Sequence, residues 1–218
     1  MKKSILLPCI FLIAAASISP ADLITQFNFT SGSASPDTEL SNTSSTDFLR
    51  GPGLDGSLDG DPALLFTNNR AEFRPPLSSN SDSTNLDNGE YGFFTINADS
   101  GFQLNLQNIT YNTARAGSSP DQMAVYYSLD SGTTKTKVGE VSANSSGNHD
   151  LSGSGFQGIS TIDFYFVPNG NNSTTTDQSR FVSVDSVEVN GTAIPEPGTL
   201  VMMTLALGTM LLFRRRKG

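Results

Sequence analysis

The chain has 218 residues, a length that fits one domain with a sizeable core. Only 16% of the residues are charged and 9% are aromatic, whereas 20 glycines and 11 prolines are typical of a chain with many turns. Six of the 13 basic residues lie at the two ends, so positions 22–194 hold seven basic and 20 acidic residues. This acidic section excludes nucleic acid as a partner, because binding to a phosphate backbone needs clustered Lys and Arg.

The first 21 residues have the pattern of a secretory signal peptide. Lys2 and Lys3 form a charged start, an apolar stretch runs over positions 5–16, and small residues follow. We expect cleavage after Ala21, because the polar chain then begins at residue 22. The single cysteine of the chain, Cys9, lies in the segment removed, so the processed protein cannot form a disulfide.

Positions 22–194 are predicted to form an all-β domain. Apolar and polar residues alternate with the period of two that marks a strand with one buried face. The predicted strands are Leu23–Phe29, Ala63–Phe66, Tyr91–Ile96, Phe102–Gln107, Ile109–Thr113, Met123–Leu129, Lys137–Ser142, Ile162–Phe166 and Phe181–Val189. No window shows the spacing of an amphipathic helix over three turns, and turn residues separate the strands. The pattern predicts an antiparallel two-sheet sandwich of jelly-roll type with about eight to ten strands.

The last predicted strand changes phase near its middle. Its valines fall on one face before residue 185 and on the opposite face after it. A β-bulge near Asp185 and Ser186 would bring all of them to the same side.

Three polar stretches are predicted to be loops: Ser31–Asp61, Ser78–Gly89 and Asn169–Ser179. In the first, oxygen-bearing side chains alternate around a glycine turn as they do in a calcium loop; they are Asp55, Ser57, Asp59 and Asp61. The twelfth position of the loop is Phe66 rather than Glu, which excludes an EF-hand. A structural calcium site at these four residues is one hypothesis, and a solvated acidic turn is the other.

Enzymatic chemistry has little support in the sequence. His149 is the only histidine and lies in a Gly/Ser/Asn-rich stretch that we expect to be a loop. The chain has no Gly-x-Ser-x-Gly elbow, no phosphate-binding loop and no His/Cys cluster for zinc. A glycosidase needs only two converging carboxylates, and nothing among the 20 acidic residues selects such a pair. We therefore predict no enzyme and no cofactor beyond the possible calcium.

Two tyrosines are candidate contacts for a glycan. Alternation places Tyr126 and Tyr165 opposite the apolar faces of their strands, where an aromatic ring can stack on a sugar. Packing within the sheet is the alternative interpretation, and the absence of tryptophan weakens the glycan hypothesis.

The C-terminus has the pattern of a short membrane segment. Positions 199–213 carry no charge, and Arg214, Arg215, Arg216 and Lys217 follow directly. As a helix the segment would span about 22 Å, less than the ~30 Å of a bilayer core, so flanking residues would have to complete the span. The basic cluster would stay in the cytoplasm, which predicts a single-pass protein with its domain outside. A soluble core helix is the alternative.

Pro195, Glu196 and Pro197 directly precede this segment. The tripeptide, the apolar segment and the basic cluster together resemble the PEP-CTERM sorting signal of Gram-negative bacteria, also catalogued as an ice-binding-protein C-terminal domain. The resemblance covers positions 195–218. It implies that an exosortase, an integral-membrane protease, removes the tail and passes the protein to the envelope or to an exopolysaccharide matrix. It implies a cellular location but no activity. The threonines lack the regular spacing of an ice-binding face.

The order of the apolar segments between the two ends of the chain also resembles that of the jelly-roll outer domains of such tailed proteins. We therefore predict a protein exported to the cell surface or extracellular matrix, with a non-enzymatic structural or adhesive role. The alternative is an extracellular carbohydrate-binding module or a glycan-active enzyme.

Overall fold

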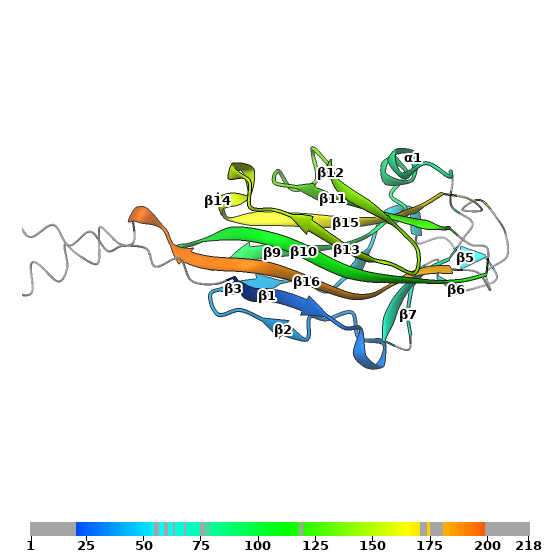
Figure 1. The fold of residues 1–218 in the computed structure, drawn as a ribbon, viewed down its shortest axis with the longest axis horizontal. Helices are drawn as coiled ribbons and strands as arrows, with labels where there is room; N and C mark the ends of the chain where they lie inside the picture. Colours follow the sequence, from blue (N-terminus) through cyan, green and yellow to red (C-terminus); the bar gives the residue numbers. More distant parts are fainter. Residues whose placement is uncertain are drawn as a thin grey trace, which may run out of the picture.

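The computed structural model describes residues 21–54, 57–58, 61–62, 64–67, 69–74, 77, 79–117, 120–170, 174 and 181–198. These residues form the predicted all-β sandwich of two antiparallel sheets (Figure 1). Residues 1–20 of the predicted signal peptide, the apolar segment 199–213 and the basic cluster 214–217 lie outside them. Within the described residues, no helix is long and apolar enough to cross a membrane.

The larger sheet has eight described strands, whose central order is β13-β10-β16-β1-β2. β14 pairs with β10, β8 pairs with β16, and β7 pairs with β8. The strands are β1 (Asp22–Phe27), β2 (Thr38–Glu39), β7 (Leu64–Thr67), β8 (Arg70–Phe73), β10 (Phe102–Ala116), β13 (Ser146–Asp150), β14 (Gln157–Ile159) and β16 (Phe181–Pro195).

The smaller sheet has six described strands in the order β12-β11-β15-β9-β3, with β4 also paired to β9. They are β3 (Thr43–Ser45), β4 (Leu49–Arg50), β9 (Gly92–Ala98), β11 (Gln122–Ser128), β12 (Thr136–Ser142) and β15 (Thr161–Asn169). From β9 to β16 the chain passes repeatedly between the sheets, which gives the sandwich its jelly-roll-like connectivity. The remaining elements are the pair β5 (Ser57–Leu58) and β6 (Asp61–Pro62), the helix α1 (Asp82–Asp87), and the 3₁₀ turns η1 (Thr30–Gly32), η2 (Pro52–Leu54) and η3 (Ser154–Phe156).

The core between the sheets is rich in phenylalanine. Phe27 of β1 and Phe94 of β9 meet across it with ring centroids 4.7 Å apart. Phe48 and Phe166 are 5.6 Å apart, and all four rings are at most 1% exposed. Burial of a phenylalanine side chain stabilises a fold by roughly 1.5–3 kcal/mol. Contacts between rings of opposite sheets therefore hold the two layers together.

The predicted bulge in the last strand is confirmed. Ser186 pairs with Asn112 of β10, but the next pair along the ladder joins Val184 to Thr113. Asp185 is thus the extra residue on β16. As a result the valines on both sides of the bulge are fully buried in the same core: Val182, Val184, Val187 and Val189.

Two predicted strands, 102–107 and 109–113, are one strand in the structure. β10 runs without a break from Phe102 to Ala116, and its register against β16 shifts between Leu106 and Asn108. Gln107 is therefore a bulge residue, not the end of a strand. A bulge preserves pairing while it changes the phase of alternation, and that change resembles a strand boundary in the sequence.

Two elements lie in stretches that the sequence analysis assigned to loops. The stretch around His149 forms β13, which pairs with residues 108–112 of β10. The helix α1 lies within the predicted loop Ser78–Gly89. β13 has no alternation of apolar residues, because only Gly147 of its five residues is buried. Its strand structure therefore comes from pairing with β10 rather than from a hydrophobic pattern.

Candidate functional site

The outer face of the smaller sheet carries a second apolar cluster. Its buried members are Leu86, Ala124, Tyr126, Tyr165 and Val167, and Tyr91 and Phe93 pack partly against them. α1 lies over this face and is fixed to β15 by Asn85, whose Nδ2 donates to the carbonyl of Pro168 at 2.9 Å. We call this surface the aromatic face. Its strands are apolar on both sides, so a small core forms outside the sandwich.

The predicted glycan contacts, Tyr126 and Tyr165, lie on this face. Both point away from the main core, as alternation predicted, but they are only 8% and 4% exposed. The Tyr126 hydroxyl donates to Asp82 of α1 at 2.9 Å, and the Tyr165 hydroxyl donates to Asp163 at 3.2 Å. The two rings are therefore packed on the sheet, as in the alternative interpretation of their pattern. Their contact with a glycan remains a prediction.

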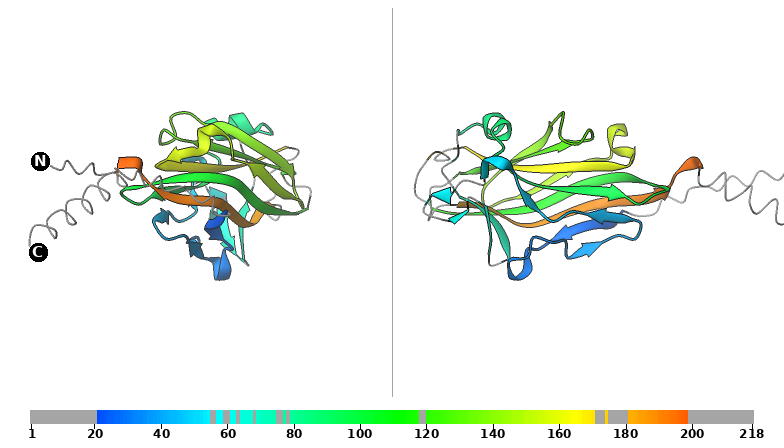
Figure 2. Two further views of the ribbon diagram at one scale, coloured as in Figure 1. Left: turned by 60° about the vertical axis from the view of Figure 1, so that its left-hand side comes forward. Right: turned by 180° about the vertical axis from the view of Figure 1, so that it is seen from behind.

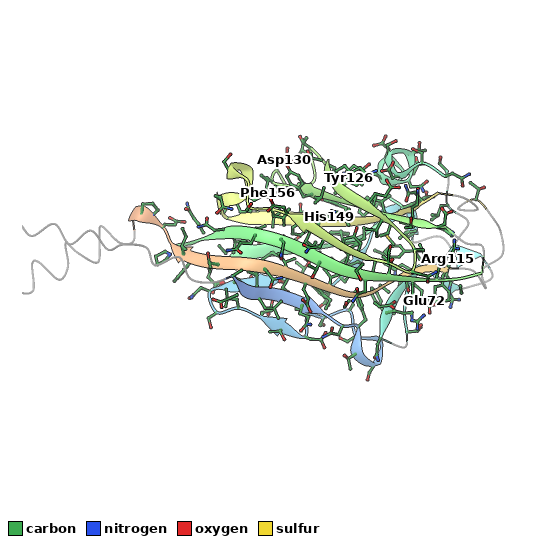
Figure 3. The ribbon with its side chains drawn as sticks, in the orientation of Figure 1. Glu72, Arg115, Tyr126, Asp130, His149 and Phe156 are labelled. Atoms are coloured by element: carbon green, nitrogen blue, oxygen red, sulfur yellow. The ribbon has the colours of Figure 1, made fainter. Side chains whose placement is uncertain are left out.

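Charged groups cover part of the aromatic face. Lys137 forms an ion pair with Asp82 at 2.5 Å and another with Glu140. Burial and the bond to Asp82 raise the pKa of Tyr126 to about 12, so this hydroxyl keeps its proton at neutral pH. Lys135 lies above the Tyr165 ring, 5.3 Å from its centroid. Figure 3 shows Tyr126 on this side of the molecule. The aromatic face is thus largely closed by its own side chains.

The outer face of the larger sheet is polar and open. Side chains of neighbouring strands are joined there by hydrogen bonds, many from asparagine and glutamine. Asn190 of β16 donates to Asn108 of β10 at 2.9 Å, and Gln26 of β1 donates to Glu188 of β16 at 2.8 Å. Asn112 of β10 donates to the Ser186 hydroxyl at 3.0 Å. We call this surface the polar face.

A hollow of about 430 Å³ opens on the polar face, at the edge formed by β10 and β13. Its lining residues all have polar side chains: Gln107, Asn108, Asn148, Asp150 and Ser152. We call it the polar hollow. Three primary amides, a carboxylate and a hydroxyl give it hydrogen-bond donors and acceptors side by side.

The bulge in β10 builds this hollow. Because Gln107 is the extra residue, Gln107 and its neighbour Asn108 both line the hollow. The carbonyl of Gln107 accepts the backbone N–H of Leu151 at 2.8 Å, which ties the chain leaving β13 to the bulge. Asn108 uses its Oδ1 to accept from Asn190, which leaves its Nδ2 group as a donor. Bulges often redirect side chains in this way near functional sites.

Asp150 supplies the negative charge of the hollow. It is exposed, and its Oδ1 accepts the backbone N–H of Ser152 at 2.8 Å. Hydrogen bonds from Ser152 lower the pKa of Asp150, so the carboxylate is ionised at neutral pH. An ionised acceptor among neutral amides suits a ligand that carries hydroxyl or cationic groups.

His149 lies on the opposite side of β13 from the hollow. Its Nε2 is 3.1 Å from the Tyr111 hydroxyl, and its ring fills the space above Gly139 of β12, where a Cβ atom would lie 2.1 Å from Cε1. Figure 3 labels His149 on β13. Burial lowers the pKa of its imidazole. The expectation of a loop residue is wrong. His149 packs between the edges of the two sheets, where the Tyr111 hydroxyl is its hydrogen-bond partner.

The calcium hypothesis falls mostly outside the described residues. Asp55 and Asp59 are not described, and only the backbones of Ser57 and Asp61 are, in β5 and β6. These strands pair antiparallel, with Ser57 opposite Pro62 and Leu58 opposite Asp61. Among the described side chains, no group of three or more His, Cys, Asp or Glu residues is placed to hold a metal ion.

The sorting tripeptide continues the last strand. Pro195 ends β16, and the backbone N–H of Glu196 donates to the carbonyl of Gly101 at 2.8 Å. Pro197 is exposed. The basic cluster that follows lies outside the described residues.

None of the residues that line the polar hollow was predicted from the sequence. One signal could have located part of it. Inward residues follow the series Leu104, Leu106, Ile109 and Tyr111, so the spacing changes from two to three at the bulge. The closing strand β13 has no comparable signal.

Residues 193–217 match the PEP-CTERM protein-sorting motif. The predicted resemblance is confirmed, and the match contains both the tripeptide and the basic cluster. The motif implies that the protein is exported and sorted. No curated protein matches the chain.

Several solved structures are similar in shape at low identity. A family 29 carbohydrate binding module from Piromyces equi matches with 10% identity and a TM-score of 0.38, over 78% of this chain and 88% of its own. The C-terminal domain of a chitobiase from Bacteroides fragilis matches with 14% identity and a TM-score of 0.35, over 71% and 96%. Similarity at this level supports no conclusion about a ligand.

Proposed function

We propose that this protein is a non-enzymatic adhesive component of the cell surface or extracellular matrix, and that it binds a neutral exopolysaccharide through the polar hollow. The sorting motif supports this location, because an exosortase-like membrane protease would recognise the tail and remove it. The observation that carries the binding proposal is the open hollow of about 430 Å³ with five polar lining residues.

The chemistry of the hollow favours sugar hydroxyls. A primary amide offers an acceptor oxygen and two N–H donors, so it can pair with adjacent hydroxyl groups that each donate and accept. Asn148 and Asp150 lie on β13 with Asn108 opposite Asp150 on β10, which places this set across two neighbouring strands. Hydrogen bonds to the charged Asp150 are the strongest that this surface offers.

Charge selects a neutral polymer over an acidic one. The hollow has one carboxylate and no basic side chain among its lining residues. Positions 22–194 are strongly acidic as a whole. An acidic polysaccharide would therefore be repelled both at the site and at long range.

The same lining argues against cleavage of the bound polymer. Glycoside hydrolysis commonly uses two carboxylates that flank the bond to be broken. Asp150 is the single carboxylate among the residues that line the hollow. With one carboxylate among its described lining residues, we expect the hollow to bind a sugar without cleaving it.

Affinity gel electrophoresis of the processed protein tests the proposal. Hydroxyethylcellulose in the gel serves as a neutral probe and alginate as an acidic one. We expect the neutral polymer to retard the protein, and we expect the double variant Asn148→Ala/Asp150→Ala to weaken binding by tenfold or more, about 1.4 kcal/mol. The control variant Asp47→Ala removes an exposed carboxylate next to β4 of the other sheet and should leave retardation unchanged.

Equal retardation of the double variant and the wild type would refute the hollow as the site. Absence of retardation by the neutral polymer would refute the proposed function. Melting temperatures of both variants within 2 °C of the wild type, roughly what a surface change of 0.5 kcal/mol produces, would show that loss of binding is not loss of fold.

A further inference from the structure

The sorting tripeptide has no linker between itself and the sandwich. Pro195, its first residue, pairs with Phe102 at the start of β10. The backbone N–H of Glu196, its second residue, donates to the carbonyl of Gly101 at 2.8 Å. The core residue Val189 lies only six positions before the tripeptide. The first residue of the sorting signal is therefore part of the larger sheet, and the second is bonded to the turn beside it.

The turn that holds Glu196 is itself fixed. Gly101 has a φ of 85°, a conformation that glycine adopts without strain. The N–H of Phe102 donates to the carbonyl of Asp99 at 3.0 Å, and the N–H of Asp99 donates to the carbonyl of Asn42 at 2.9 Å. The contact to Glu196 thus joins two ordered parts of the backbone.

The third residue of the tripeptide is in a different environment. Pro197 and Gly198 are exposed, whereas Pro195 and Glu196 are half-buried. A side-chain carbon added at Gly198 would meet no atom within 4 Å. The boundary between docked and accessible chain therefore lies between Glu196 and Pro197.

The end of β16 is also costly to release. β16 lies between β10 and β1, and residues 190–195 pair with residues 102–108 of β10. Gly191 packs so closely that an added Cβ would lie 2.3 Å from the carbonyl oxygen of Asn105. A protein that recognises an extended peptide forms backbone hydrogen bonds to it, and those of this strand are already made. A protease would have to peel the strand before it could bind there.

We propose that removal of the tail cuts the chain on the C-terminal side of Glu196, so that the mature sandwich keeps Pro195, the end of β16, and Glu196, which is bonded to Gly101. The step is a hydrolysis: the peptide bond breaks, and water supplies the hydroxyl of the new carboxyl end and the proton of the new amino end. This inference depends on tail removal, which is part of the proposed function.

The first strand of the sandwich begins beside the proposed cut. Asp22, the first residue of β1, pairs with Gly191 of β16. Both described ends of the chain therefore leave the sandwich at the same pole (Figure 2). A cut after Glu196 frees this pole from the tail without loss of any strand pair.

Mass spectrometry of the protein from the envelope and culture fractions of its native host tests the proposal. The C-terminal peptide is expected to end at Glu196 or at a later residue before position 214. A peptide that ends at Pro195 or earlier would overturn the inference and leave tail removal intact. A chain that keeps Arg214 to Lys217 in every fraction would overturn tail removal and the inference with it.

Hydrogen exchange on the full chain provides a second measurement that needs no variant. The amide of Glu196 is expected to exchange at least tenfold more slowly than the amide of Gly198, because only the former is bonded within the described structure. Equal, unprotected exchange at both positions would show that the tripeptide is not docked, and it would remove the basis of the proposed position.

Discussion

The two outer faces of this sandwich differ in the type and exposure of the residues that point outward from their strands. On the smaller sheet, outward residues such as Tyr126 and Tyr165 are large and apolar, and α1 closes over them. On the larger sheet, outward residues such as Asn108 and Asn148 are amides that remain open to solvent around a hollow. We therefore infer a division of roles: the aromatic face contributes to stability, and the polar face binds the polymer that we propose as its ligand.

The largest effect is expected from two asparagines on opposite faces. Asn85 of α1 is fully buried, and its side chain bonds to the backbone N–H and carbonyl of Ser79 and to the carbonyl of Pro168. Asn85→Ala leaves these groups without partners and should lower the free energy of unfolding by about 3 kcal/mol. Asn148→Ala on the polar face should change it by less than about 0.5 kcal/mol. Urea unfolding measures both, and similar losses for the two variants would contradict the division.

Calcium bound by the acidic loop would raise the stability of the protein. This prediction rests on the alternation of Asp55, Ser57, Asp59 and Asp61. At a Ca²⁺ concentration ten times its Kd, a single site should stabilise the protein by about 1.4 kcal/mol, a rise in melting temperature of about 3–6 °C. Chelator should reverse the rise. A melting temperature that responds to neither would remove calcium from the account.

A smaller effect is expected from one hydroxyl of the aromatic face. Tyr126→Phe removes the hydrogen bond to Asp82 and should cost about 1 kcal/mol of unfolding free energy. Tyr127→Phe is the matched control, because within the described residues the Tyr127 hydroxyl has no hydrogen-bond partner while its ring packs on Phe156 at 4.7 Å. If Tyr127→Phe proved as costly as Tyr126→Phe, the bond to α1 would not explain the closed face.

The smallest effect concerns pH and the edge between the two sheets. Burial lowers the pKa of His149 below its value in the unfolded chain, so the unfolded state binds the proton more readily. The stability that neutral His149 contributes is fully present above about pH 6.5, the pKa of histidine in the unfolded chain, and it decreases as the pH falls below that value. Melting temperature from pH 7 to pH 5 should therefore fall more for the wild type than for His149→Gln. Parallel curves would show that His149 does not sense pH.

Much of the fold could be predicted because its strands obey simple alternation. The phase change among the valines of β16 was enough to locate the bulge at Asp185. The aromatic face was harder to predict, since β11 buries residues on both sides, Met123 and Val125 toward the main core and Tyr126 toward α1. Alternation marks which residues share a face, but it does not reveal what covers that face.

The candidate site could hardly be predicted at all. Gln107 and Asn108 line the hollow because a bulge places them there, and a spacing of three between Leu106 and Ile109 was the available sign. Asn148 and Asp150 belong to a strand with no apolar pattern, held by its pairing with β10. Polar residues brought together by strand pairing leave no periodic trace in the sequence.

The most direct test of the central claim is hydrogen exchange of the processed protein with and without hydroxyethylcellulose. We predict that the polymer slows exchange in residues 107–108 and 146–152, around the polar hollow, and leaves β9 and β15 under the aromatic face unchanged. Protection confined to β9, β11 and β15, or no protection anywhere at saturating polymer, would contradict the claim that the polar face is the binding surface.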